Sequence, residues 1–353
     1  MDCLARLVAH HASCVYCRAV HDIPILDHLR PRQRRLRHWL AICTAMLLSV
    51  ASQPAQAGDG LDLRLPLLSA QGQQALAADA TGPVDADGVS AFFSDWAELL
   101  ARARASQPNW SSPLVTTTGL LEERLRFDAE ALHSGNGTST TVLDGGRGLD
   151  LIVSDSNEIQ LAAAPYDTRT SRSGKGALSG FGDWPFLRVE QRLVSSPESS
   201  GDYVVTAWLS VQAPTGIKSL TSGAWTFSPT VAFGKGWANF DIQGTVGVAV
   251  PTSHTEVQGH QIQTNIALQY HVLDVLWPEV EVNWTYYSDG QRGGLNQVYL
   301  TTGLVLGRFS LGDHMRFTFG GGYQIAAAPS YRAKPLTPAE DHAWLFTSRL
   351  NFQ

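Results

Sequence analysis

Hydrophobic and polar residues alternate along most of the chain from about residue 116 onward. In the segment 121–128, apolar Leu125 and Phe127 alternate with charged Arg124, Arg126 and Asp128. Such alternation places the two kinds of side chain on opposite faces of a β-strand. The pattern returns in the segments 187–193, 203–212, 240–250, 262–272, 280–286, 315–325 and 344–352. Strands of this kind separate an apolar solvent from a polar one.

The length of these segments distinguishes a membrane sheet from a soluble one. We count about twelve segments of about 9 to 13 residues, the length of a tilted membrane crossing, with 146–166 read as a hairpin. Strands of soluble sandwiches are usually about 5 to 6 residues long. An open sheet would leave unpaired backbone groups in lipid. The sequence therefore predicts an all-β fold, a transmembrane antiparallel β-barrel of about 12 strands over residues 114–353. We expect its last strand at 342–352.

The first 57 residues have the pattern of a leader. Arginines 30, 32, 34, 35 and 37 precede the apolar run 39–50 and the small-residue motif Ala55-Gln56-Ala57. This order is typical of a secretory signal peptide, with Gly58 as the mature N-terminus. Residues 1–28 lie upstream of an ordinary signal peptide and are interpreted as the product of a start codon placed too early. The alternative is a metal site around Cys14 and Cys17, but a single pair at this spacing is weak evidence.

Residues 58–113 have a different texture and contain one predicted helix, at 89–105. Phe92, Phe93 and Trp96 share one stripe with Leu99 and Leu100 at helical spacing. One interpretation is a short helix packed on the periplasmic end of the barrel. The other is a plug or gate inside the lumen, formed by Phe92, Phe93 and Trp96.

Charge and cysteine content narrow the environment. The leader holds 7 of the 26 basic residues, 3 of the 32 acidic residues and all 4 cysteines. The remaining chain is acidic, which argues against a nucleic-acid partner. An exported chain of this size without cysteine cannot rely on disulfides, so its stability must come from a large hydrogen-bonded framework such as a closed barrel.

Charged residues on the polar face of two strands are the candidate lumen lining. A charge facing lipid at mid-depth would cost about 2 to 4 kcal/mol for Arg, so these side chains should point inward and form a mixed-charge ladder. Glu122 would pair with Arg188 if the two strands are near neighbours. Tryptophans near segment ends are expected to form interfacial girdles. The ladder residues are Glu122, Arg124, Arg126, Asp128, Arg188, Glu190 and Arg192, and the tryptophans are Trp184, Trp208, Trp237, Trp277, Trp284 and Trp344.

Several short motifs resemble a known family. The string Pro108-Asn109-Trp110-Ser111, followed by Gly119-Leu120-Leu121-Glu122, looks like the opening of the outer-membrane family named for the MetA pathway of phenol degradation. Gly180-Phe181-Gly182-Asp183-Trp184 and Ala213-Pro214-Thr215-Gly216 resemble later blocks of that family in the right order. Gln107 replaces an Arg usual in the family. The resemblance covers about residues 107–353 and implies an outer-membrane barrel thought to pass small, often aromatic, molecules.

Signals for catalysis are thin. Ser210 and His271 lie on lumen phases of different strands, but no spacing brings them together as a Ser–His hydrolase requires. We therefore expect a channel or transporter for small, aromatic or hydrophobic molecules, with no catalytic residues, metal or cofactor. The alternative is a barrel with a plugged lumen that acts as a structural protein or a lipid-active enzyme. Expected partners are the lipid bilayer, lipopolysaccharide, the solute and the outer-membrane assembly machinery.

Overall fold

A computed structural model describes residues 86–171, 176–273, 275–328 and 339–352. The predicted signal peptide and residues 58–85 lie outside the described residues. The elements are α4 (Ala86–Ala105), β1 (Arg124–His133), β2 (Ser139–Leu143), β3 (Gly148–Ser154), β4 (Asn157–Ala162), β5 (Tyr166–Thr170), β6 (Leu178–Phe181), β7 (Trp184–Ser196), β8 (Tyr203–Ala213), β9 (Thr226–Trp237), β10 (Phe240–Pro251), α5 (Thr255–Gln258), β11 (Gln261–Tyr270), β12 (Leu276–Tyr287), β13 (Asn296–Ser310), β14 (Met315–Ala328) and β15 (His342–Phe352).

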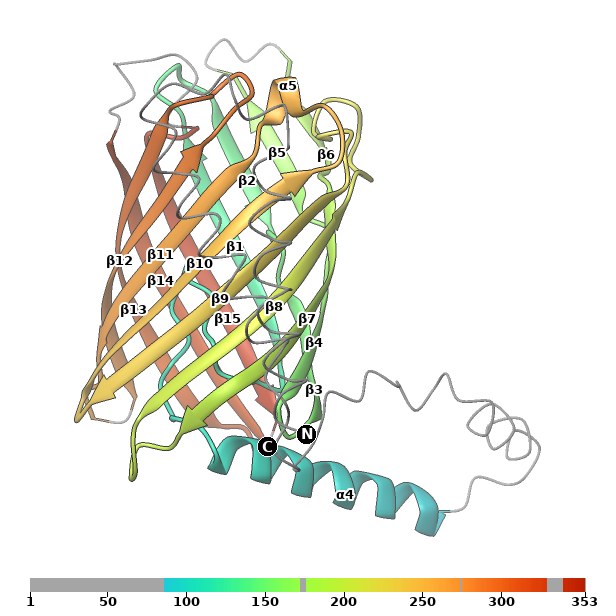
Figure 1. Cartoon of the computed structure of the whole chain (residues 1–353), viewed down its shortest axis with the longest axis vertical. Coiled ribbons are helices and arrows are strands. Elements are labelled where there is room, and N and C mark those ends of the chain that lie inside the picture. The colour runs from blue at the N-terminus through green and yellow to red at the C-terminus, as the bar shows by residue number, and fades with distance from the viewer. Residues whose placement is uncertain (1–85, 172–175, 274, 329–338, 353) are drawn as a thin grey trace, which may run out of the picture. The chain divides into compact units, whose positions relative to one another are not determined.

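The strands form one closed antiparallel sheet (Figure 1). The last strand, β15, pairs with β1 along its whole length, from Arg124 opposite Asn351 to His133 opposite His342. Three positions in the wall are each filled by two strands that lie end to end, namely β2 with β3, β5 with β4, and β6 with β7. At the first of them, β1 pairs with β3 at one end and with β2 at the other. The described strands thus make a 12-strand barrel, and both the barrel and its last strand at 342–352 are confirmed.

The faces of the barrel are those of a membrane protein. On β1, Leu125 and Phe127 are 49% and 41% exposed on the outside, whereas Arg124 and Arg126 are buried inside. Apolar groups outside and charges inside reverse the order found in a water-soluble barrel, so the outer surface contacts lipid. The protein is an outer-membrane barrel. Connections at the end that holds both Arg124 and Phe352 are short, as expected of the periplasmic end.

The tryptophan girdle is only partly as predicted. Trp184, Trp237 and Trp344 are exposed on the outer wall. Trp208 and Trp277 are buried instead, because they share the strand phase of inward-facing neighbours such as Thr206 and Glu279. Their proximity to strand ends did not identify the face on which they lie.

Helix α4 lies at the periplasmic end (Figure 1) and begins three residues before the predicted start. Leu100 and Ala103 pack against Leu121 and Ile152 at the rim of the barrel. Arg192 of β7 donates a hydrogen bond to the Ala103 carbonyl at 2.8 Å. No helix among the described residues is long and apolar enough to cross a membrane.

Residues 106–123 do not form wall, although the sequence placed the barrel from residue 114. The first strand begins only at Arg124, and the preceding segment is extended chain with few exposed residues. It follows α4 and runs inside the barrel until Glu123 reaches the rim. We call residues 106–123 the plug segment.

Candidate functional site

The predicted charge ladder does face the interior. Arg124, Arg126 and Glu190 are each 1% exposed, and Asp128, Arg188 and Arg192 are also buried. Glu122 belongs to the plug segment rather than to a strand, and it is partly buried. These side chains of β1 and β7 are thus buried inside the barrel, and their role in lining a solute route stays a prediction.

The pairing within the ladder differs from the prediction. Arg124 donates from Nε to Asp150 Oδ2 at 2.7 Å and also pairs with Glu122. Arg188 pairs with Glu190 and lies 3.6 Å from Glu158. No pair between Glu122 and Arg188 forms, because β3 and β4 stand between β1 and β7 in the sheet.

The sequence analysis missed the acidic partners on those two intervening strands. Asp150 and Glu158 are 0% and 1% exposed, and Gln160 donates to Asp150 Oδ1 at 2.6 Å. They alternate with Leu149, Leu151 and Ile159, which is the same signal that identified the ladder on β1. The prediction treated 146–166 as a single hairpin and therefore did not use this alternation.

The plug segment is held by hydrogen bonds between its backbone and charged wall side chains. Leu114 N–H donates to Glu279 at 2.9 Å, and Val115 N–H donates to Glu281 at 2.8 Å. From β15, Arg349 donates to the Pro113 carbonyl at 2.7 Å. Extended backbone cannot satisfy its own polar groups, so the wall supplies the partners that water would otherwise provide. These wall residues were not predicted.

Two apolar side chains of the plug segment fit against glycines of the wall. Leu114 packs with Trp277 and Val305, and a Cβ atom added at Gly303 or Gly322 would overlap it. Trp110 packs against Gly234 in the same way. Glycine in a strand often marks such a close approach. The wall therefore has a shape that is complementary to the plug segment.

The residues proposed from sequence as a gate lie elsewhere. Phe92 and Phe93 are 62% and 55% exposed on α4, outside the lumen, and Trp96 packs at its rim. The apolar stripe of the helix was predicted. The position of the helix along the barrel axis depends on tertiary contacts, which cannot be predicted from the spacing of apolar residues. The lumen is filled by the extended chain that follows the helix.

The structure does not bring Ser210 and His271 together into a Ser–His site. Ser210 pairs with Ser228 in the upper half of the wall. His271 lies in a periplasmic turn, where its ring stacks on Trp277 at 4.7 Å. Among the described residues, no group of three or more His, Cys, Asp or Glu side chains could hold a metal ion.

Glu123 joins the plug segment to β1, and burial of its carboxyl group gives the stability of the folded protein a pH dependence. Its Oε2 accepts a hydrogen bond from Ile152 N–H at 2.7 Å, and Oε1 is buried without a partner in the described structure. Burial raises the pKa of Glu123 from 4.5 to about 7, against the lowering effects of the Ile152 hydrogen bond and Arg104. The unfolded chain therefore releases this proton at lower pH than the folded chain does.

We expect the stability contributed by Glu123 to be full below pH 4.5 and to be lost as the pH rises to about 7. The midpoint of urea unfolding, measured in detergent between pH 4.5 and 7.5, should fall less steeply in Glu123→Gln than in the wild type. Equal slopes for the two proteins would contradict this assignment.

Comparisons with known proteins come from structure alone. No family model matches the chain, so its resemblance to the phenol-pathway family stays a prediction. No curated protein matches it either. An outer membrane channel from Pseudomonas putida F1 aligns over 69% of this chain and 100% of its own, at 13% identity and a TM-score of 0.45. The NanC porin aligns over 64% and 99%, at 7% identity and a TM-score of 0.40. An anion-selective porin from Comamonas acidovorans aligns over 65% and 97%, at 9% identity and a TM-score of 0.28. The chain is similar in structure to outer-membrane barrels that include channels and porins.

Proposed function

We propose that the protein is a gated outer-membrane channel in which the plug segment is the gate. The observation that carries this proposal is the mode of attachment of the plug. It is bound to the wall through separate side-chain hydrogen bonds, such as those from Arg126 and Arg349, rather than through a continuous strand ladder. Each of these bonds can exchange with water, so the segment can leave the lumen without breaking the sheet.

The lumen that opens is polar and carries both signs of charge. Arg124, Arg188, Asp150 and Glu190 line one side, and Glu279 and Glu281 line the other. Charged groups of both signs on one side and carboxylates on the other favour a polar solute over apolar lipid. With the family resemblance, this arrangement favours small molecules, including aromatic ones with polar substituents.

Two partners follow from the same proposal. The exposed apolar band contacts lipid and, on the outer leaflet, lipopolysaccharide. The penultimate Phe352 ends the last strand and is the terminal aromatic that we expect the assembly machinery to recognise.

A second candidate function is a permanently plugged structural barrel or lipid-active enzyme. The observation that favours it is the glycine-lined fit of Leu114, since such a fit would also serve a fixed plug. A cross-link distinguishes the two candidates. Leu114→Cys with Gly303→Cys places two thiols at the contact, and no native cysteine lies among the described residues.

We expect proteoliposomes with the reduced double variant to admit small solutes such as catechol or arabinose, and oxidation to abolish uptake. Reductant should restore it. Leu114→Cys alone, treated identically, is the control. Uptake that is equal before and after complete cross-linking would refute the gate, and absence of uptake in every state would support the plugged barrel.

A further inference from the structure

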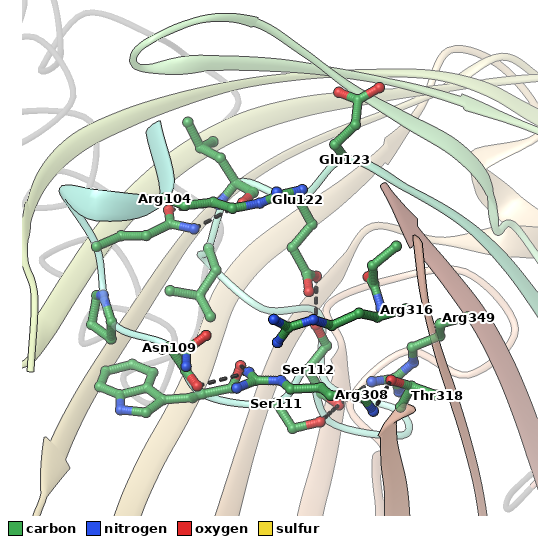
Figure 2. Close-up of a pocket in the computed structure, with 16 residues that line it drawn as sticks. Arg104, Asn109, Ser111, Ser112, Glu122, Glu123, Arg308, Arg316, Thr318 and Arg349 are labelled. Carbon is green, nitrogen blue, oxygen red and sulfur yellow. Dashed lines mark hydrogen bonds between the residues drawn. The ribbon is translucent and has the colours of Figure 1, made fainter. Parts of the chain in front are cut away.

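A cavity of about 110 Å³ lies at the periplasmic end of the lumen, under the plug segment (Figure 2). Its walls come from the last turn of α4, two arms of the plug segment (residues 107–112 and 120–123) and the periplasmic ends of β13 to β15. Four arginines line it, Arg104, Arg308, Arg316 and Arg349, against two carboxylates, Glu122 and Glu123.

Arg308 reaches this cavity because of a β-bulge. The register between β13 and β14 shifts between Gly307 and Phe309, and Arg308 has a positive φ of 62°. The shift turns Phe309 outward, where it is 42% exposed, and turns Arg308 inward. Arg308 donates to the carbonyls of Asn109 and Trp110, each at 2.7 Å. Bulges and positive φ at a large residue are features that often position a functional side chain.

Arg316 is directed into the same space. It follows the inward phase of Thr318 on β14, and its guanidinium points into the cavity between Glu122 and Arg308 (Figure 2). Among the residues that the structure describes, this guanidinium group makes no hydrogen bond or ion pair. The nearby carboxylate of Glu122 is already engaged by Arg124 and by the Ser112 hydroxyl.

The remaining lining gives the cavity an apolar side. Pro108, Trp110 and Leu120 contribute to it. The cavity thus combines an excess of guanidinium groups with an apolar surface. A guanidinium offers two parallel N–H donors that match the two oxygens of a carboxylate.

We propose that this cavity binds a small organic carboxylate with a compact apolar body, held by Arg316 and Arg308. The proposal rests on the proposed channel function, since it names the class of solute that meets the plug on the periplasmic side. A carboxylate is a stronger acceptor than the neutral carbonyls of Asn109 and Trp110. Its binding therefore competes with the hydrogen bonds that hold this arm of the plug segment.

Binding can be measured without permeation, so its failure is distinct from a failure of the channel function. The probe is 4-fluorobenzoate, followed by ¹⁹F NMR with the full mature protein in detergent. We expect saturable binding by the wild type, about tenfold or more weaker binding by Arg316→Gln, and no binding of neutral 4-fluorobenzyl alcohol. Arg292→Gln, in an extracellular loop, is the matched control and should bind as the wild type does.

Three results would overturn the proposal. They are absence of saturable binding by the wild type, equal affinity of Arg316→Gln, and displacement of 4-fluorobenzoate by inorganic phosphate at an equal concentration. The last result would identify a general anion site rather than a carboxylate site.

A second inference rests on the exposed aromatic residues of α4. Phe92 lies three helical turns before Ala103 and so points in the same direction. Ala103 is fully buried against the barrel rim, whereas Phe92 lies beyond it, in the half of α4 that extends past β3 and β7 in Figure 1. Phe92, Phe93 and Trp96 contact one another, with ring centroids 5.5 Å apart for the first pair and 6.2 Å for Phe92 and Trp96.

We infer that this aromatic end of α4 lies in the headgroup region of the inner leaflet. The lower wall beside it is already lipid-facing, with Val153 and Leu193 exposed by 48% and 43%. The helix continues that apolar surface under the bilayer, as amphipathic interfacial helices do. The opposite face carries Ser94, which is exposed.

A fluorophore attached at Phe92→Cys tests this placement, with Ser94→Cys as the matched control. In phospholipid vesicles we expect label at 92 to be quenched by a lipid that carries a nitroxide on its acyl chain, and label at 94 to be quenched mainly by aqueous iodide. Quenching of both labels by iodide alone, or protection of label 92 from both quenchers, would overturn the inference.

Discussion

Deletion of residues 108–118 should convert the protein from a mostly closed barrel into a steadily conducting pore. The deleted stretch contains Leu114, Val115 and Thr116, whose N–H groups bind Glu279 and Glu281. Without it, these carboxylates and Arg349 regain water, and the lumen fills with solvent along its length. We expect the single-channel current in planar bilayers to change from rare brief openings to a sustained open level.

Two measurements make this result interpretable. The deletion variant should keep heat-modifiable migration on a gel, because β1 and β15 still pair through their backbones. Glu281→Gln is a milder variant that weakens the hydrogen bonds from the Val115 and Thr116 N–H groups. It should raise the frequency of openings without making them permanent. A folded deletion variant with unchanged current would show that the plug segment does not block the route.

Removal of a buried ladder charge should have the largest effect on stability. Arg124→Met removes the arginine nearest to Asp150, which is 0% exposed and keeps only Arg188 at 3.8 Å. Loss of one partner of a buried pair typically costs about 3 to 5 kcal/mol, because the remaining charge stays desolvated. The double variant Arg124→Met with Asp150→Asn removes both charges and should recover much of the loss.

An exposed pair on the same protein supplies the control. Arg102 and Asp155 lie 3.2 Å apart with side chains 57% and 62% exposed. Since exposed pairs contribute about 0 to 1 kcal/mol, Arg102→Met should change the free energy of unfolding little. All variants can be compared by urea unfolding in detergent. An Arg124→Met variant as stable as Arg102→Met would mean that water already solvates the ladder.

The sequence predicted the wall much better than its contents. Alternation of charged and apolar residues in β1 and β15 is a local property, so it identified the strands and their inward faces. The plug segment has no such signal. Ser112 and Pro113 become interior residues only because a side chain from a distant strand, Arg349, binds their carbonyl groups.

Irregular positions of the wall could not be predicted from the alternation either. The Arg308 side chain points inward because of a bulge in the pairing of β13 with β14. The pairing of these two strands is not visible in the sequence around Arg308. Simple alternation assigns Arg308 and Phe309 to the wrong faces. The acidic residues of β3 and β4 were predictable in principle, since Asp150 and Glu158 follow the rule that identified Arg124.

The plug segment is fixed at both ends, by α4 before it and by β1 immediately after it. It therefore behaves as a tethered ligand of the lumen rather than as a removable stopper. A tethered ligand keeps a high effective concentration, on the order of millimolar for short flexible links, whatever the amount of protein in the membrane. Reclosure is consequently a first-order event that competes with each passage of solute. The duration of an opening should be set by the rate at which this one segment rebinds, and it should be independent of protein density.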